Sequence, residues 1–176
     1  MNRLLARSFS TTLARLQEYP YALRKIAHPP IAPSSAPHMP ETMAALTFGA
    51  PENATRSSIV GWLKDSSAKI EPANFIENPD FTARIQAVLE KHAHEDPALQ
   101  AQAAFQKSGW MNVADGRNPP PLGRTPAAED ILGAVLVEDK IIQPGSFQPN
   151  FVHRPVSLDG LFQLPAFLHD KLVDSL

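Results

Sequence analysis

The clearest hydrophobic periodicity in the chain lies between Asn78 and His94. Asn78-Pro79-Asp80 combines a capping residue, a proline at the first helical position and an acid in the first turn. Apolar residues then recur at helical spacing, at Phe81, Ile85, Val88 and Leu89. This pattern predicts a helix that runs to about His94 and packs its apolar stripe in the core.

A second start signal, Asp96-Pro97, follows almost at once. Ala98, Ala101 and Phe105 share one face of the expected helix, and Gly109 is a suitable stop. Because the junction between the two helices is short, we expect an antiparallel helical hairpin.

Strand patterning dominates the stretch from Trp110 to Leu164. Residues 131–137 form the densest β-branched run, and the chain returns through Ile141 and Ile142 towards Phe151 and His153. These residues predict a β-hairpin element. A turn over residues 157–160 and a closing helix after Leu164-Pro165 follow, with Phe167, Leu168, Leu172 and Val173 as the expected buried face.

Proline content divides the rest of the chain. Residues 17–52 are rich in Pro and Ala, so we expect an extended arm or linker there. A short apolar stripe at Ile59, Val60, Trp62 and Leu63 favours a helix between Thr55 and Lys64. The fold prediction is therefore an α+β domain over residues 53–176, preceded by a Pro-rich arm.

The first sixteen residues have a different character. They carry Arg3, Arg7 and Arg15, several hydroxyl residues and no acid, with Leu and Phe on one helical face. This composition is typical of a mitochondrial transit peptide. Residues 9–16 also resemble the octapeptide removed by the mitochondrial intermediate peptidase, and both observations predict cleavage between Leu16 and Gln17.

Composition excludes several classes of function. Without residues 1–16 the chain keeps 13 basic residues against 18 acidic ones, a net charge of −5, which disfavours nucleic-acid binding. The chain has no cysteine, no phosphate-binding loop and no apolar run long enough to cross a bilayer. Because there is no phosphate-binding loop, we expect no cofactor. We also expect no metal, because His92 and His94 point in different directions on a helix.

Five residues are candidates for contact with a partner or an anion: Arg117, Arg124, His153, Arg154 and Trp110. Arg117 and Arg124 flank three prolines and suit bidentate binding of carboxylate or phosphate, although Asp115, Glu129 or Asp130 could instead hold this loop internally. The pair His153-Arg154 either bonds to loop carbonyls and acids or supplies acid–base groups. Trp110 is either half-buried or, if exposed, an interface anchor.

Two functions follow from these patterns. The first is a non-catalytic mitochondrial accessory or assembly protein that docks on a larger complex. The second is a small matrix enzyme or anionic-ligand-binding protein that uses Arg117, Arg124 and His153. Convergence of those three side chains on a concave apolar site would favour the second.

Overall fold

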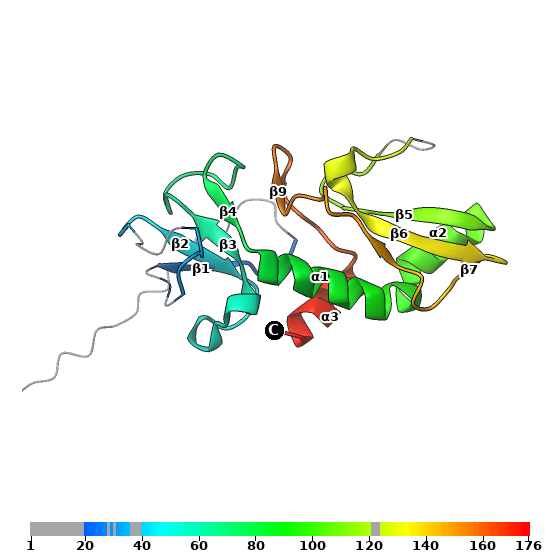
Figure 1. Ribbon diagram of the computed structural model, residues 1–176, viewed down its shortest axis with the longest axis horizontal. Helices are drawn as coiled ribbons and strands as arrows, with labels where there is room; N and C mark the ends of the chain where they lie inside the picture. Colours follow the sequence, from blue (N-terminus) through cyan, green and yellow to red (C-terminus); the bar gives the residue numbers. More distant parts are fainter. Residues whose placement is uncertain (1–19, 28, 30, 36–39, 121–123) are drawn as a thin grey trace, which may run out of the picture.

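The computed structural model describes residues 20–27, 29, 31–35, 40–120 and 124–176. Two antiparallel sheets lie at opposite ends of the molecule, and helix α1 (Pro79–His92) runs between them (Figure 1). Helix α3 (Ala166–Asp174) packs against α1, and one large apolar core joins the sheets and the helices. The expected mixed α+β class is confirmed at this level. None of the described helices has the length and apolarity that a bilayer crossing requires.

The first sheet has the order β1 (Arg24–Ala27), β2 (Ala44–Thr47), β3 (Ile59–Leu63) and β4 (Phe75–Glu77). Every residue of β2 and β3 is buried. Part of this sheet packs into the main core, and Met43, Ala45, Ile59 and Trp62 form a second, smaller apolar cluster. The sheet is therefore covered on both faces.

These strands correct two expectations. Residues 24–27 and 44–47 belong to a sheet, so residues 17–52 are not simply a linker or arm. Residues 55–64 form the short 3-10 helix η2 (Arg56–Ser58) followed by β3, so the helix expected there is wrong. A strand buried on both faces lacks alternation, and its apolar run cannot be distinguished from a short buried helix by periodicity. A further 3-10 turn, η1 (Pro51–Asn53), precedes them.

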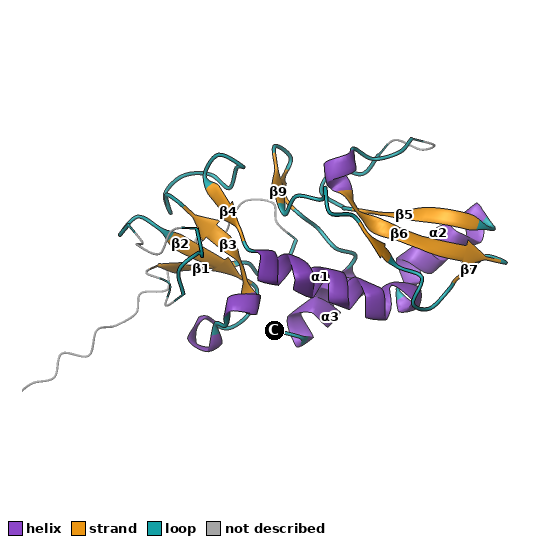
Figure 2. Cartoon of the chain, viewed as in Figure 1, coloured by secondary structure: helices purple, strands orange, loops and turns teal. Residues whose placement is uncertain are grey.

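The second sheet is built on β6 (Ile131–Glu138), whose expected position is confirmed. It pairs with β5 (Gly109–Ala114) on one side and with β7 (Ile141–Ile142) and β8 (Gln148–Pro149) on the other. Helix α2 (Pro97–Gln106) lies against β5 and β7 (Figure 2). It buries Leu99 and Ala103, whereas Phe105 is 88% exposed. The small-residue face of α2 is thus on the outside, and α2 packs on the sheet rather than along α1 as the expected helical hairpin requires.

Local start signals account for the helices that were anticipated. The side chain of Asn78 accepts a hydrogen bond from the backbone of Asp80 at the start of α1, and the four expected core residues are buried. The 3-10 turn η3 (Ala93–Glu95) follows α1. Helix α3 begins directly after Pro165 and buries Leu168 and Leu172, as expected, together with His169. Of the other two residues expected on the buried face, Phe167 is only partly buried and Val173 is 36% exposed. The 3-10 turn η4 (Ala128–Asp130) directly precedes β6. Shortly before α3, strands β9 (Val156–Ser157) and β10 (Gly160–Leu161) form a hairpin, and its Gly160 has a φ of 100°.

Candidate functional site

A buried polar cluster stands where β5 ends. The carboxylate of Asp115 is fully buried, and its Oδ1 accepts hydrogen bonds from the backbone N–H groups of Arg117 at 3.0 Å and Gln163 at 2.7 Å. Its Oδ2 lies 2.9 Å from Nε2 of His153, which is only 8% exposed. Asp115 therefore ties the end of β5 to the segments before and after the β9–β10 hairpin.

Arg117 completes the cluster from the same turn. Its Nε donates to Oδ1 of Asp130 at 2.7 Å and lies 3.6 Å from the carboxylate of Asp115. Its terminal N–H groups donate to the backbone carbonyls of Glu129, Arg154 and Gly160. The side chain has no exposed surface. Arg117 is thus held internally, one of the two possibilities its sequence context left open, and offers no guanidinium face to an external anion.

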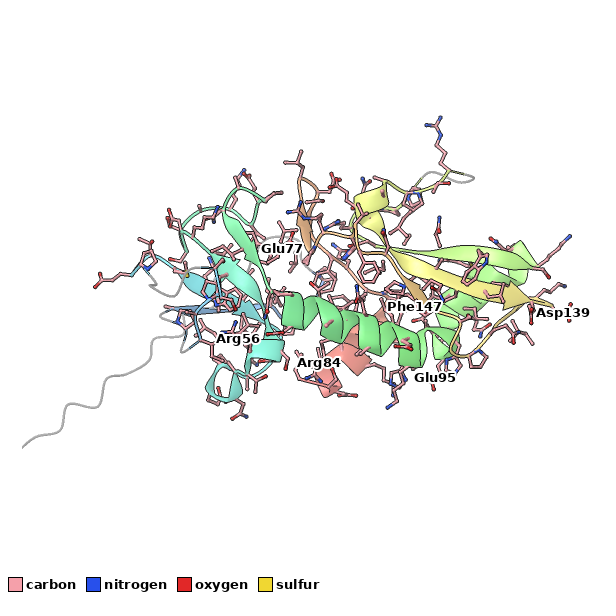
Figure 3. All side chains as sticks on the ribbon, in the orientation of Figure 1. Arg56, Glu77, Arg84, Glu95, Asp139 and Phe147 are labelled. Carbon is pink, nitrogen blue, oxygen red and sulfur yellow. The ribbon has the colours of Figure 1, made fainter. Side chains whose placement is uncertain are left out.

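The remaining candidate residues lie around this cluster or away from it. Nε of Arg154 pairs with Glu77 on β4 at 2.5 Å, which links the two halves of the molecule (Figure 3 labels Glu77). Arg124 is exposed and has no recorded bond among the described residues. Trp110 is 55% exposed and precedes Asp115 by five strand residues, or about 17 Å. The structure therefore brings Arg117, His153 and Arg154 together and leaves Trp110 apart.

The polar groups of this cluster bond to one another and so have a structural role. Asp115 and Asp130 face one guanidinium and one imidazole, and backbone groups take up most of the remaining hydrogen-bonding capacity. No serine, threonine or lysine side chain makes a recorded bond to these four groups within the described residues. The cluster thus closes on itself, and its evident effect is to fix the conformation of three loops.

A cavity of about 590 Å³ lies elsewhere, between residues 20–22, Phe48 and α3. Its wall includes the ring of His169, which stacks on Tyr21 with centroids 3.5 Å apart. Burial lowers the pKa of His169, while burial and the nearby Asp170 raise the pKa of Tyr21. None of the five candidate residues lines this cavity.

The described residues contain no group of three acids or histidines that could hold a metal ion. Instead, Nδ1 of His92 bonds to the carboxylate of Glu95 at 2.7 Å, and this bond lowers the pKa of Glu95.

Large apolar side chains stand on the loops that the cluster holds. Phe151 is 84% exposed, Val152 58% and Leu158 90%. We call residues 115–118, 150–154 and 157–160 the loop platform. Sequence reasoning did not select these apolar residues, although Leu158, at the centre of a turn where polar residues are usual, carried a signal.

Comparisons with known proteins add no relative: no protein-family model, curated protein or solved structure matches the chain.

Proposed function

We propose that this protein is a non-catalytic mitochondrial accessory or assembly protein, and that it docks on a larger protein complex through the loop platform. One observation carries the proposal. The polar groups of the cluster are used internally, whereas Phe151, Val152 and Leu158 beside them are exposed to solvent.

The internal bonds support this reading because they fix the loops in advance. Asn150 donates from its side chain to the carbonyls of Ala128 and Ile131, and Asn118 donates to the carboxylate of Asp159. Arg117 holds the hairpin through the carbonyl of Gly160. A surface whose loops are already ordered loses little conformational entropy when a partner binds. Exposed phenylalanine and leucine on such a surface suit insertion into apolar pockets of a protein.

The alternative, a matrix enzyme or anion-binding protein, has less support. It requires the side chains of Arg117, Arg124 and His153 to face a common concave site. Arg117 is turned inward and His153 pairs with Asp115. The mitochondrial part of the proposal rests on the composition of residues 1–16, which lie outside the described residues together with the expected Leu16–Gln17 cleavage bond.

Replacement of the two most exposed apolar residues of the loop platform tests the docking surface. We would express the full chain with Phe151→Ser and Leu158→Ser in mitochondria and follow its migration on native gels. The expected result is loss of the high-mass species while the thermal midpoint of the purified variant is unchanged. Ile141→Ser, 57% exposed on β7, is the matched control and should keep the high-mass species. Exclusion of the wild-type chain from any larger complex would contradict the proposal.

A further inference from the structure

The strongest unassigned feature is the outer edge of β5 together with the neighbouring face of α2. Among the described residues, β5 pairs only with β6, so its other edge is open. The side chain of Gln106 on α2 donates to the carbonyl of Trp110 on β5 at 2.7 Å, which places this flank of the helix beside the open edge. We name the combined area, formed by residues 98–114, the β5 flank.

The hydrogen bonds of β6 show which groups of β5 point outward. Leu136, opposite Trp110, donates its N–H to Oγ of Ser146 and accepts from the N–H of Gln143. Both of its backbone groups therefore face away from β5. In an antiparallel ladder the opposite residue then also points its groups away, so the N–H and C=O of Trp110 lie at the open edge. Two residues further along β5, the backbone N–H and C=O of Asn112 also point to the open edge.

The β5 flank carries few of the features that protect edge strands from pairing, and its one ladder irregularity lies at the far end of β5, between Val113 and Ala114. From Pro97 to Ala114 the chain contains one charged residue, Lys107, and no proline after the first helical position. Edge strands that remain single usually carry charges, prolines or bulges. On α2, the stripe of Ala98, Ala101 and Phe105 faces outward, and Trp110 is 55% exposed. Depletion of charge with exposed aromatic side chains is the composition of an interface core.

We propose that the β5 flank is the contact between two copies of this chain, joined by antiparallel pairing of β5 with its own symmetry mate. The pattern is self-complementary. With Met111 on the two-fold axis, Trp110 faces Asn112 of the second copy, and their outward N–H and C=O groups bond to each other at both symmetry-related pairs. The carbonyl of Trp110 already accepts from the side chain of Gln106 and would take the N–H of the second copy with its other lone pair. The near absence of charge means that like charges do not oppose this contact, as they would across most other faces of an acidic chain.

The register is also determined by the strand itself. Pairing centred on Asn112 would require outward groups at Ala114, but the ladder shifts between Val113 and Ala114. Pairing centred on Met111 uses only residues on the regular side of this irregularity. It also places the two α2 helices side by side beneath one continuous sheet, where Ala98 and Ala101 allow close approach.

Sedimentation of the full chain tests the proposal. We expect a species of twice 19.2 kDa for the wild type. Asn112→Pro removes an outward N–H, which an edge strand tolerates, and Ala101→Lys adds a charge to each helix at the contact. Both variants should sediment as monomers with unchanged circular dichroism. Ile141→Lys, on the same sheet but outside the β5 flank, should remain dimeric.

A cysteine pair tests the register, because the chain has no cysteine of its own. Opposite residues of a hydrogen-bonded antiparallel pair have Cα atoms about 5.5 Å apart, within the range of a disulfide. Trp110→Cys with Asn112→Cys should give a covalent dimer on oxidation, and each single replacement should not. A wild-type chain that sediments only as a monomer overturns the proposal, including the case in which the β5 flank takes a strand from another protein. A dimer that persists in both monomer-directed variants overturns it as well.

Discussion

The two sheets use similar numbers of apolar residues in different ways. In the first sheet, β2 and β3 are buried along their whole length, and Trp62 is 1% exposed with its Nε1 donating to the carbonyl of Ile31. In the second, burial along β5 alternates over much of its length, and Trp110 is 55% exposed. The faces of the first sheet are covered by its own chain. The second sheet has exposed aromatic residues beside β5 and loops held by a polar cluster, so we propose that recognition lies in this half.

The largest expected effect comes from the cluster that supports the second half. Arg117→Ala leaves the carboxylates of Asp115 and Asp130 buried without their cation, and removing one partner of a buried pair costs about 3–5 kcal/mol. Chemical denaturation measures the change in the free energy of unfolding. Arg124→Ala, at an exposed position of the following loop, is the matched control and should stay within about 0.5 kcal/mol of wild type. If both variants changed the free energy of unfolding by the same small amount, Arg117 would not be what holds the loop platform together.

The two tryptophans give the most direct comparison of the sheets. Trp62→Ala empties a fully buried site and should lower the free energy of unfolding by about 3–5 kcal/mol. Trp110→Ala should change it by about 1 kcal/mol or less in the monomer, because half of that side chain is already in water. Urea titrations at low protein concentration separate folding from association. A large loss at Trp110 would show that the open face is structural.

A smaller effect should be shared by both sheets. A Cβ added at Gly61 would stand 2.6 Å from the carbonyl oxygen of Ile76, and one added at Gly133 would stand 2.5 Å from that of Gln148. The added Cβ would also meet the ring of Phe75 at Gly61 and the ring of Phe147 at Gly133. Substitution by alanine should therefore cost about 1–3 kcal/mol in either sheet, as overpacking does. Gly49→Ala, whose new Cβ would meet only ordinary contacts, is the control. Thermal melts of the three variants decide whether the two sheets share this requirement.

The smallest expected effect concerns pH and the packing of α3 against residues 20–22. Burial lowers the pKa of His169, so the unfolded chain binds its proton more readily than the folded one. Stability from this residue is present above the unfolded pKa of 6.5 and declines as the pH falls below it. His169→Phe keeps an aromatic ring against Tyr21 and should flatten the dependence of the thermal midpoint between pH 7.5 and 5. An unchanged slope in that variant would assign the dependence to other groups.

The sequence predicted the elements whose signals are local. Asn78-Pro79 and Leu164-Pro165 mark helix starts through capping and backbone geometry, and residues 131–137 mark a strand through β-branched content. Strand β3 was misread because burial on both faces removes alternation. The packing of α2 on the sheet, instead of in a hairpin with α1, was not predicted because both faces of this helix carry apolar residues. Only the sheet beneath it selects Leu99 and Ala103 for burial.

The polar cluster was predictable only in part. Asp115 and Asp130 are near Arg117 in sequence, and an internal role for this loop followed from that proximity. The contributions of Gly160 and Gln163 depend on backbone groups more than 40 residues away, which no local pattern reveals. The exposure of Phe151 and Leu158 is likewise a property of the folded loops.

The contacts of Asp115 and Arg117 join residues far apart in the sequence, and this separation affects when the cluster can form during folding. The cluster needs the backbone of Gln163, so it cannot close until almost the whole chain is available. A chain that emerges from the ribosome with its amino end first can assemble the first sheet and α1 well before the residues near Gln163 have been made. Contacts formed after the rate-limiting step affect unfolding rather than folding. We therefore expect Arg117→Ala to accelerate unfolding and to leave the refolding rate nearly unchanged. Arg117 would then stabilise the native state mainly by slowing its unfolding.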